Sequence, residues 1–271
     1  MNTCHISSKA RACAVVIAVL ATSAAAMAWE PAPDMTAQQV LREARQDAAA
    51  GKLAEAAEKH LWFHEHALER EPSMAGVRLS FAIHDWVALA RRYPAAMTQL
   101  IAVRDATVAQ IDAGGMAGRR ALSEVIGINR YLHAPESTRD AFNRLVARDP
   151  VIAEESVLEV LPALIELNDI ALASQHLRVS EVMSRQERFY THLKEAKLGL
   201  PADQLAEVKR WQQRHVDLQL ARVAYVLCKD RRQADADQVV ARGRALLEAD
   251  ASAHHMTEAL RCIAPPAEDL G

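Results

Sequence analysis

The chain has little glycine, proline or aromatic content. Its 271 residues include 9 Gly and 10 Pro, and Phe, Trp and Tyr together make up 4% of the chain. Sheets joined by tight turns draw on all three classes, so the composition argues against an all-β fold and against a long flexible linker. Alanine, leucine, glutamate, arginine and glutamine dominate instead, and these residues favour helices. The composition therefore predicts an all-α fold.

A block of basic residues is also lacking. The formal net charge is -3 at pH 7, and Lys and Arg are scattered along the chain. Nucleic acids and anionic membrane surfaces attract proteins through clusters of basic side chains. A mildly acidic chain without such a cluster offers no electrostatic reason to expect either partner.

Long apolar runs are missing except near the N-terminus. Lys9 and Arg11 precede an uncharged apolar run over 12–20, and a small-residue stretch ends in the A-x-A sequence at 26–28. This order is typical of a cleavable secretory signal peptide. The run is shorter than the roughly 20 residues that span a bilayer, which argues against an N-terminal membrane anchor. We therefore predict a signal peptide over 1–28 and a protein that is periplasmic or secreted.

Cysteine is scarce in the rest of the chain. Of the four cysteines, only Cys228 and Cys262 lie beyond the predicted signal peptide. In an oxidising compartment these two could form one disulfide, and the alternative is two separate buried thiols. The sequence does not place their α-carbons within the roughly 7 Å that a bridge requires, so both alternatives stay open.

The few glycines and prolines divide the remaining chain into helices. Gly51, Pro72 and Pro150 mark breaks, and Thr36 is the expected N-cap of the first helix. The expected helices cover 36–50, 52–71, 73–92, 94–113, 118–132, 135–148, 151–167, 169–177, 180–198, 201–229, 234–249 and 252–262. The tail over 264–271 is expected to be disordered.

Helices that pair at a spacing of about 35 to 45 residues are typical of an α-solenoid. The segment 51–56 (GKLAEA) resembles the turn and second-helix start of a tetratricopeptide repeat, and 67–72 (ALEREP) resembles its end. The spacing between Gly51 and Pro72 is four residues longer than in the family pattern, which adds about one helical turn.

A second match to the repeat consists of Thr138, Phe142, Leu145 and Pro150, with leucine at a position where the family has alanine. The resemblance covers roughly 36–178. It implies a right-handed α-solenoid of antiparallel helix pairs over 29–178, continued over 179–263 by a cap of longer helices. It also implies a groove that binds peptides or partner proteins. The chain is similar in this respect to exported bacterial repeat proteins without an assigned activity.

Histidines are concentrated on the second predicted helix. His60 and His64 lie four residues apart in the middle of its apolar face, and His84 on the next helix could supply a third imidazole. Zinc, copper or nickel would suit such ligands. The HExxH motif is absent, however, and packed, hydrogen-bonded histidines are the favoured interpretation. A metal site at His60, His64 and His84 remains the alternative.

The predicted partner-binding residues are Trp62, His66, Arg78 and Trp86. Aromatic residues and arginine dominate binding hot spots, so exposure on a groove would make them anchors for a peptide. Burial between helices is the default expectation for the two tryptophans.

Two other polar groups are expected to be unremarkable surface features. Ordinary ion pairs on a solvated face are the expectation for Glu124, Asn129, Arg130 and Arg139. The adjacent His254-His255 is expected to project in two directions and to make a poor metal site.

Catalytic motifs are not found. The sequence contains no G-x-S-x-G elbow, P-loop, dinucleotide fingerprint or Cys-x-x-Cys pair. We therefore predict no enzymatic activity and no cofactor. The leading hypothesis is a non-catalytic interaction module or scaffold of the bacterial envelope with a protein or peptide partner. The alternatives are a metal-binding protein and a structural subunit of an envelope complex.

Overall fold

A computed structural model describes residues 29–195, 199–248 and 252–266 of the chain. All the regular structure in these residues is helical, so the all-α prediction is confirmed. The predicted signal peptide at 1–28 and the end of the predicted tail, 267–271, lie outside them. Within the described part of the chain, no helix is both long enough and apolar enough to cross a membrane.

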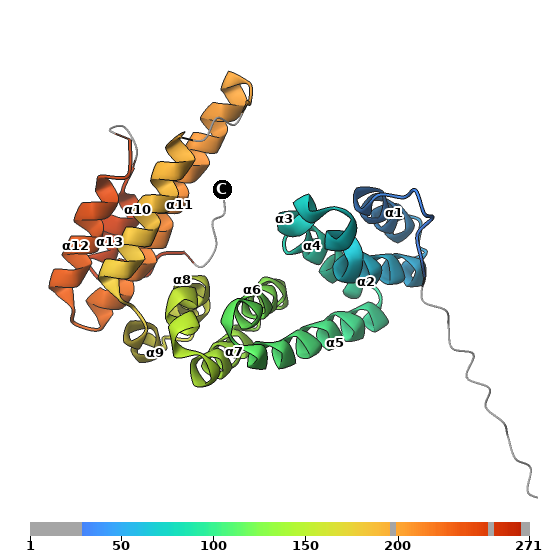
Figure 1. Ribbon diagram of the computed structural model, residues 1–271, viewed down its shortest axis with the longest axis horizontal. Helices are drawn as coiled ribbons and strands as arrows, with labels where there is room; N and C mark the ends of the chain where they lie inside the picture. The colour runs from blue at the N-terminus through green and yellow to red at the C-terminus, as the bar shows by residue number, and fades with distance from the viewer. Residues whose placement is uncertain (1–28, 196–198, 249–251, 267–271) are drawn as a thin grey trace, which may run out of the picture.

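The elements follow one another with short connections (Figure 1). They are α1 (Ala37–Ala49), α2 (Leu53–Arg70), η1 (Pro72–Met74), α3 (Ala75–Arg78), α4 (Phe81–Ala90), α5 (Pro94–Gln110), η2 (Ile111–Ala113), α6 (Gly115–Leu132), α7 (Pro135–Arg148), α8 (Pro150–Glu166), α9 (Ile170–Gln175), α10 (Val179–Glu195), α11 (Ala202–Lys229), α12 (Gln233–Arg244) and α13 (His254–Ala259).

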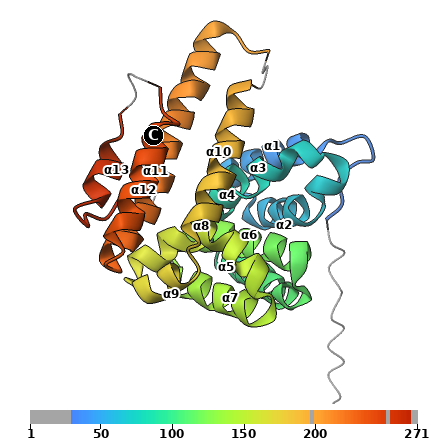
Figure 2. The same cartoon turned by 60° about the vertical axis from the view of Figure 1, so that its left-hand side comes forward.

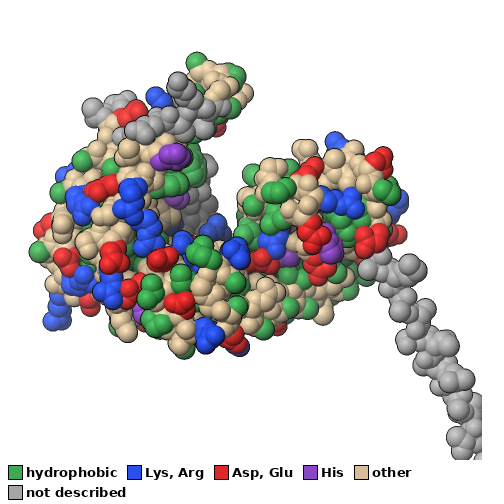
Figure 3. Space-filling view, viewed as in Figure 1, with side chains coloured by type: hydrophobic (Ala, Val, Ile, Leu, Met, Phe, Trp, Pro, Cys, Tyr) green, Lys and Arg blue, Asp and Glu red, His purple; other side chains and the backbone are tan. Residues whose placement is uncertain are grey.

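The helices are arranged as a crescent. Figure 1 shows α1 to α4 in one arm and α10 to α13 in the other, with α6 and α8 on the inner side of the connecting part and α5, α7 and α9 on its outer side. Figure 2 shows the first turns of α11 extending beyond α12 and α13. A broad hollow separates the two arms, and Lys and Arg side chains lie at its floor (Figure 3).

Local sequence signals explain where several helices begin. The Thr36 hydroxyl accepts a hydrogen bond from the backbone N–H of Gln39, and the Gln39 side chain accepts one from the backbone N–H of Thr36. This reciprocal pair is a capping box, and it confirms the predicted N-cap. Pro94, Pro135 and Pro150 occupy the first positions of α5, α7 and α8, where a missing N–H is tolerated.

Several helices end at residues with left-handed backbone conformation. Gly51 follows α1 with φ 80°, and the same region is adopted by His133 after α6, Asn168 after α8 and Arg231 after α11. A residue in this conformation turns the chain so that backbone N–H groups bond to the last carbonyl groups of the helix, and glycine is the usual residue there. Because three of the four residues are not glycine, the sequence does not mark these turns in the usual way.

The predicted continuous helix over 73–92 is wrong. Residues 72–90 form η1, α3 and α4, with a break at Leu79 and Ser80. At this break α6 passes close by: a Cβ added at Gly127 would lie 3.4 Å from the Leu79 Cβ and 3.5 Å from its carbonyl oxygen, which is ordinary van der Waals contact. The segment is therefore in contact with α6 at the point where the predicted helix is interrupted.

The start of the predicted disordered tail is ordered in the structure. Pro265 is buried, and the guanidinium group of Arg222 on α11 donates a hydrogen bond of 3.2 Å to the carbonyl oxygen of Pro266. The prediction is therefore wrong for 264–266, because a buried arginine holds this segment against the long helix.

The buried side chains form three clusters along the crescent. One lies between the N-terminal segment, α1, α2 and α4, and a second between α2, α4, α5 and α6. The third and largest extends from η2 and α6 to α13. The three clusters follow one another along the chain, so the buried core continues from one arm of the crescent to the other.

Candidate functional site

The histidines of α2 pack around Trp86 of α4. His60 is 1% exposed and its ring is stacked on the Trp86 ring at 6.1 Å between centroids, while the His64 ring is tilted at 5.9 Å. His84 is on the other side of α4, where its side chain is 67% exposed and its ring contacts that of Tyr131. No group of three potential metal ligands among the described residues includes any of these histidines. The predicted alternative of a metal site at His60, His64 and His84 is therefore wrong.

Burial sets the protonation state of His60. It lowers the pKa of the imidazole to about 4, with the positive charge of Arg45 adding to the effect and Asp85 opposing it. His60 is therefore neutral at pH 7. Its Nε2 atom has no hydrogen-bond partner in the part of the chain that the structure describes, so His60 is packed but not hydrogen-bonded there.

Glu124 of α6 is the centre of a cluster that joins four helices. One carboxylate oxygen lies 2.9 Å from Nε2 of His64 and 3.2 Å from the Thr107 hydroxyl, which donates to it. The other oxygen accepts a hydrogen bond of 2.6 Å from the guanidinium group of Arg78. Arg78 also donates to the backbone carbonyl of His64 at 2.6 Å. The expectation of a solvated face is therefore wrong for Glu124.

The charges of this cluster compensate one another. Burial alone would raise the pKa of Glu124, but the hydrogen bond from His64 and the charge of Arg78 outweigh it and lower the pKa to about 2. The carboxylate is therefore ionised at neutral pH, and both its oxygens have partners. Arg78, one of the predicted partner-binding residues, is used within the protein. The two partly buried charges pair with each other, so removing either one leaves the other without its partner.

The two predicted tryptophan contacts are also used internally. Trp62 is 5% exposed, its indole N–H donates to the Glu30 carboxylate, and the guanidinium group of Arg70 lies 5.0 Å from the ring centroid. The Trp29 ring packs edge-on against Trp62 at 6.2 Å. Trp86 is 1% exposed. Neither tryptophan presents its ring to solvent, so the prediction that they anchor a partner does not fit the structure.

His66 is the most accessible of the four predicted contact residues. Its ring lies 5.5 Å from that of Trp62, and its Nδ1 atom is 3.4 Å from the Glu69 carboxylate. Because the other three side chains are buried or paired inside, the four residues do not form one exposed surface.

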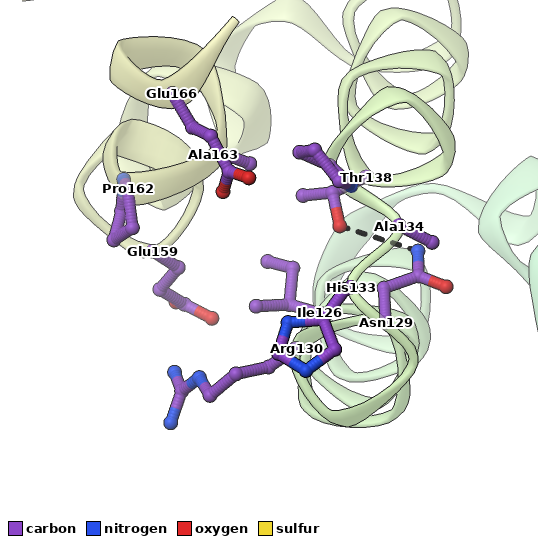
Figure 4. Close-up of a pocket in the computed structure, with 11 residues that line it drawn as sticks. Ile126, Asn129, Arg130, His133, Ala134, Thr138, Glu159, Pro162, Ala163 and Glu166 are labelled. Atoms are coloured by element: carbon purple, nitrogen blue, oxygen red, sulfur yellow. Dashed lines mark hydrogen bonds between the residues drawn. The ribbon is translucent and has the colours of Figure 1, made fainter. Parts of the chain in front are cut away.

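A pocket of about 250 Å³ opens where α6 ends, α7 begins and α8 passes beside them (Figure 4). Arg130 and His133 approach it from α6 and its C-terminal turn, whereas Glu159 and Glu166 approach it from α8. Ile126 and Pro162 supply apolar contacts. An apolar surface with a few polar groups around it is the usual composition of a binding pocket.

The pocket is one end of a longer pairing between α6 and α8. The facing residues recur at helical spacing, so that each set shares one side of its helix. They are Arg119, Ser123, Ile126 and Arg130 on α6, and Glu155, Glu159, Pro162 and Glu166 on α8. At the end remote from the pocket, Arg119 lies 3.5 Å from the Glu155 carboxylate and 3.2 Å from that of Glu159. That end is closed by its own ion pairs.

The pocket end is open. Arg130, His133 and Glu166 are exposed, and among the described residues none of their side chains has a hydrogen-bond or ion-pair partner. The pocket therefore presents a cationic group from α6 and an anionic group from α8, each available to an incoming molecule.

Asn129 gives this pocket a rigid wall. It is 1% exposed, and its side-chain N–H donates to the Thr138 hydroxyl at 3.2 Å, which ties α6 to α7 (Figure 4). The expectation of a solvated position is wrong for Asn129. Arg139 does form an ordinary ion pair, with the neighbouring Asp140. The helical spacing of the pocket residues is visible in the sequence, but no signal there pairs α6 with α8.

Cys228 and Cys262 are joined by a disulfide in the structure. Their α-carbons are 5.5 Å apart, within the range that a bridge requires. The bond connects α11 to the residues after α13. Of the two alternatives that the sequence left open, the structure contains the bridge.

Comparison with known protein families, with curated proteins and with solved structures finds no match to the chain in any of the three. Function is therefore inferred from the geometry of the pocket and from the form of the molecule.

Proposed function

We propose that the protein is an exported, non-catalytic binding module of the bacterial envelope that holds an extended peptide or protein segment between α6 and α8. The observation that carries this proposal is the unpaired Arg130 and Glu166 on the two sides of an apolar pocket. In an extended peptide, successive side chains point to opposite sides, so neighbouring residues can reach α6 and α8. An acidic group of the partner would pair with Arg130, and a basic one with Glu166.

The form of the molecule supports this proposal. The left-handed turns at His133 and Asn168 are 35 residues apart in the sequence, and each follows an inner helix of the crescent. That interval is close to the period of tetratricopeptide repeats. We take α6 with α7, and α8 with α9, as two units of a solenoid. The inner helices of such arrays form the concave surface that binds the partner.

The chemistry of the pocket favours binding over catalysis. Thr138 is the one hydroxyl-bearing residue that lines it, and this hydroxyl is engaged by Asn129. Glu159 is tied to Arg119 and Ser123. A nucleophile needs a base within hydrogen-bond reach, and the lining residues supply no such pair.

Two further observations support export. The order of residues over 1–28 is that of a signal peptide. The disulfide between Cys228 and Cys262 fits an oxidising compartment, where such bonds persist.

Site-specific photo-cross-linking in the exporting cells tests the proposed groove. A photoreactive residue replaces Ala163, which lines the pocket, and in a matched control it replaces Ala102, which is exposed on α5. We expect a defined set of cross-linked proteins from position 163 and not from 102. We also expect that set to disappear when Arg130→Ala and Glu166→Gln are combined with the probe. Equal cross-linking at both positions, or a pattern unchanged by the double substitution, would contradict the proposal.

A further inference from the structure

Three side chains of the types that bind metals lie close together on α13, in the arm formed by α10 to α13. One nitrogen or oxygen atom each of His254, His255 and Glu258 lies within 4.8 Å of the other two. Nε2 of His254 is 3.2 Å from the Glu258 carboxylate, and the two imidazole centroids are 5.3 Å apart. The expectation that the histidines project in separate directions is therefore wrong, because a rotation of 100° between neighbouring residues does not keep two imidazoles apart.

The helix that carries these residues is fixed at both ends. Six residues are too few for a stable isolated helix. At its start, the buried Asp217 carboxylate of α11 accepts hydrogen bonds from the backbone N–H groups of His255, at 3.0 Å, and Met256, at 2.8 Å. Beyond its end, the disulfide binds Cys262 to Cys228 of the same long helix. The backbone of the three ligand residues is therefore held in place by α11.

The opposite face of α13 is packed into the protein. Met256 and Ala259 are fully buried, and Met256 approaches Gly243 of α12 so closely that a Cβ there would lie 2.7 Å from its sulfur. This packing fixes the rotation of α13 and leaves His254 exposed and His255 and Glu258 half-buried. Ligands that are placed before the ion arrives lose less freedom on binding it.

We propose that His254, His255 and Glu258 bind a divalent transition-metal ion, with Zn²⁺ as the best fit. Two imidazoles and one carboxylate are a common zinc donor set, and they leave one coordination position for water. Two nitrogen donors out of three disfavour Mg²⁺ and Ca²⁺, which select oxygen ligands. The ion takes the position between His254 and Glu258, where it replaces their direct contact. Arg261 lies 3.9 Å from the Glu258 carboxylate with an exposed side chain, so it does not block the site.

Titration of the chelator-treated, untagged full chain with ZnCl₂ by calorimetry tests this site. We expect one equivalent of Zn²⁺ to bind per chain. We expect the affinity to fall by more than about 100-fold in the triple variant His254→Ala, His255→Ala, Glu258→Gln, since removing ligands costs more than removing the groups that orient them. His84→Ala, which removes an exposed histidine elsewhere, is the matched control and leaves the affinity unchanged. Because none of the three substituted side chains is fully buried, circular dichroism is expected to be the same in the triple variant and the unsubstituted chain.

No binding, or binding that the triple variant keeps, would overturn the proposal and would leave adventitious zinc as the explanation. A second measurement keeps the test independent of calorimetry. Co²⁺ bound to the full chain is expected to show the visible absorption of a low-symmetry nitrogen–oxygen site, and the triple variant is expected to lose it. In Cys228→Ser, Cys262→Ser we expect about tenfold weaker zinc binding, since the bridge orients the ligand helix; an unchanged affinity would remove the disulfide from the proposal.

Discussion

Glu124 and Arg130 lie six residues apart on α6, yet the two parts of the helix use charge in opposite ways. Glu124 faces His64 and Arg78 of the N-terminal arm and Thr107 of α5, which together contact both oxygens of its carboxylate. Arg130 faces α8 across the pocket and has no side-chain partner in the described part of the chain. The charge of Glu124 is therefore paired within the protein, whereas that of Arg130, about two turns later on the same helix, is not.

The difference follows from the environment of each charge. A charge that is shielded from water and has no partner destabilises a fold, so the partly buried Glu124 and Arg78 are tolerated there as a pair. An exposed charge remains hydrated, and pairing it contributes only about 0 to 1 kcal/mol, so Arg130 and Glu166 can stay unpaired. Loss of stability on substitution should therefore separate structural charges from those available to a ligand.

Removing Glu124 is expected to have the largest effect. Glu124→Ala leaves the partly buried Arg78 without its counter-charge, and the free energy of unfolding in urea at pH 7 should fall by about 3 kcal/mol, the lower end of the range for a broken buried pair. Glu166→Ala is the control with the same change of residue type at the pocket, and its effect should stay within about 0.5 kcal/mol. A loss below about 1 kcal/mol for Glu124→Ala would show that the cluster does not hold the helices together.

Acidification tests the same region through His60. Its pKa in the folded state, about 4, is lower than the ordinary value of 6.5, so the unfolded chain binds a proton that the folded chain refuses. The free energy of unfolding is therefore not lowered by His60 above pH 6.5, and it is lowered progressively as the pH falls from 6.5 towards 4. Between pH 7.5 and 5.0 this one group should lower the free energy of unfolding by about 2 kcal/mol.

The control for this effect is His60→Leu, which removes the titrating group and keeps an apolar side chain in the packed position. The decrease between pH 7.5 and 5.0 should be smaller by about 2 kcal/mol in the variant than in the natural protein. Equal decreases in the two proteins would mean that His60 is already protonated in the folded state, or is not buried as described.

A smaller effect is expected at Thr107. Its hydroxyl donates to Glu124 and also lies 2.9 Å from the Val103 carbonyl oxygen, while the side chain is buried. Thr107→Val keeps the shape and removes the hydroxyl, so the free energy of unfolding should fall by about 1 kcal/mol. Thr98→Val, at an exposed hydroxyl on the same helix α5, is the comparison and should change stability less. A larger loss of stability for Thr98→Val than for Thr107→Val would show that the Thr107 hydroxyl does not contribute to the cluster.

Much of the fold could be predicted because its helix boundaries are local. Thr36 supplies a capping box, and the prolines at 94, 135 and 150 mark helix starts that the structure contains. The break at Leu79 and Ser80 could not be predicted, since no proline marks it; in the fold it lies where Leu79 contacts Gly127 of α6, 48 residues later. Local signals mark where these helices begin, whereas the interruption of the predicted helix over 73–92 is seen only in the folded chain.

The polar sites were harder to predict for the same reason. Histidine spacing on α2 indicated a special cluster, but only the folded chain shows that Glu124 pairs with His64, 60 residues away. Arg130 is expected on a solvated face, and nothing in the sequence singles out Glu166, because neither position shows which helix it faces. Their significance comes from the pairing of α6 with α8 and from the absence of other partners among the described residues.

The smallest effect on stability is expected at the pocket, together with the largest effect on binding. Arg130→Ala combined with Glu166→Gln should change the free energy of unfolding by less than about 0.5 kcal/mol, because both side chains are exposed and unpaired. The same variant should lose the cross-links formed from position 163. If its stability instead falls as far as that of Glu124→Ala, the two charges are structural as well, and the distinction between a closed cluster and an open pocket on α6 does not hold.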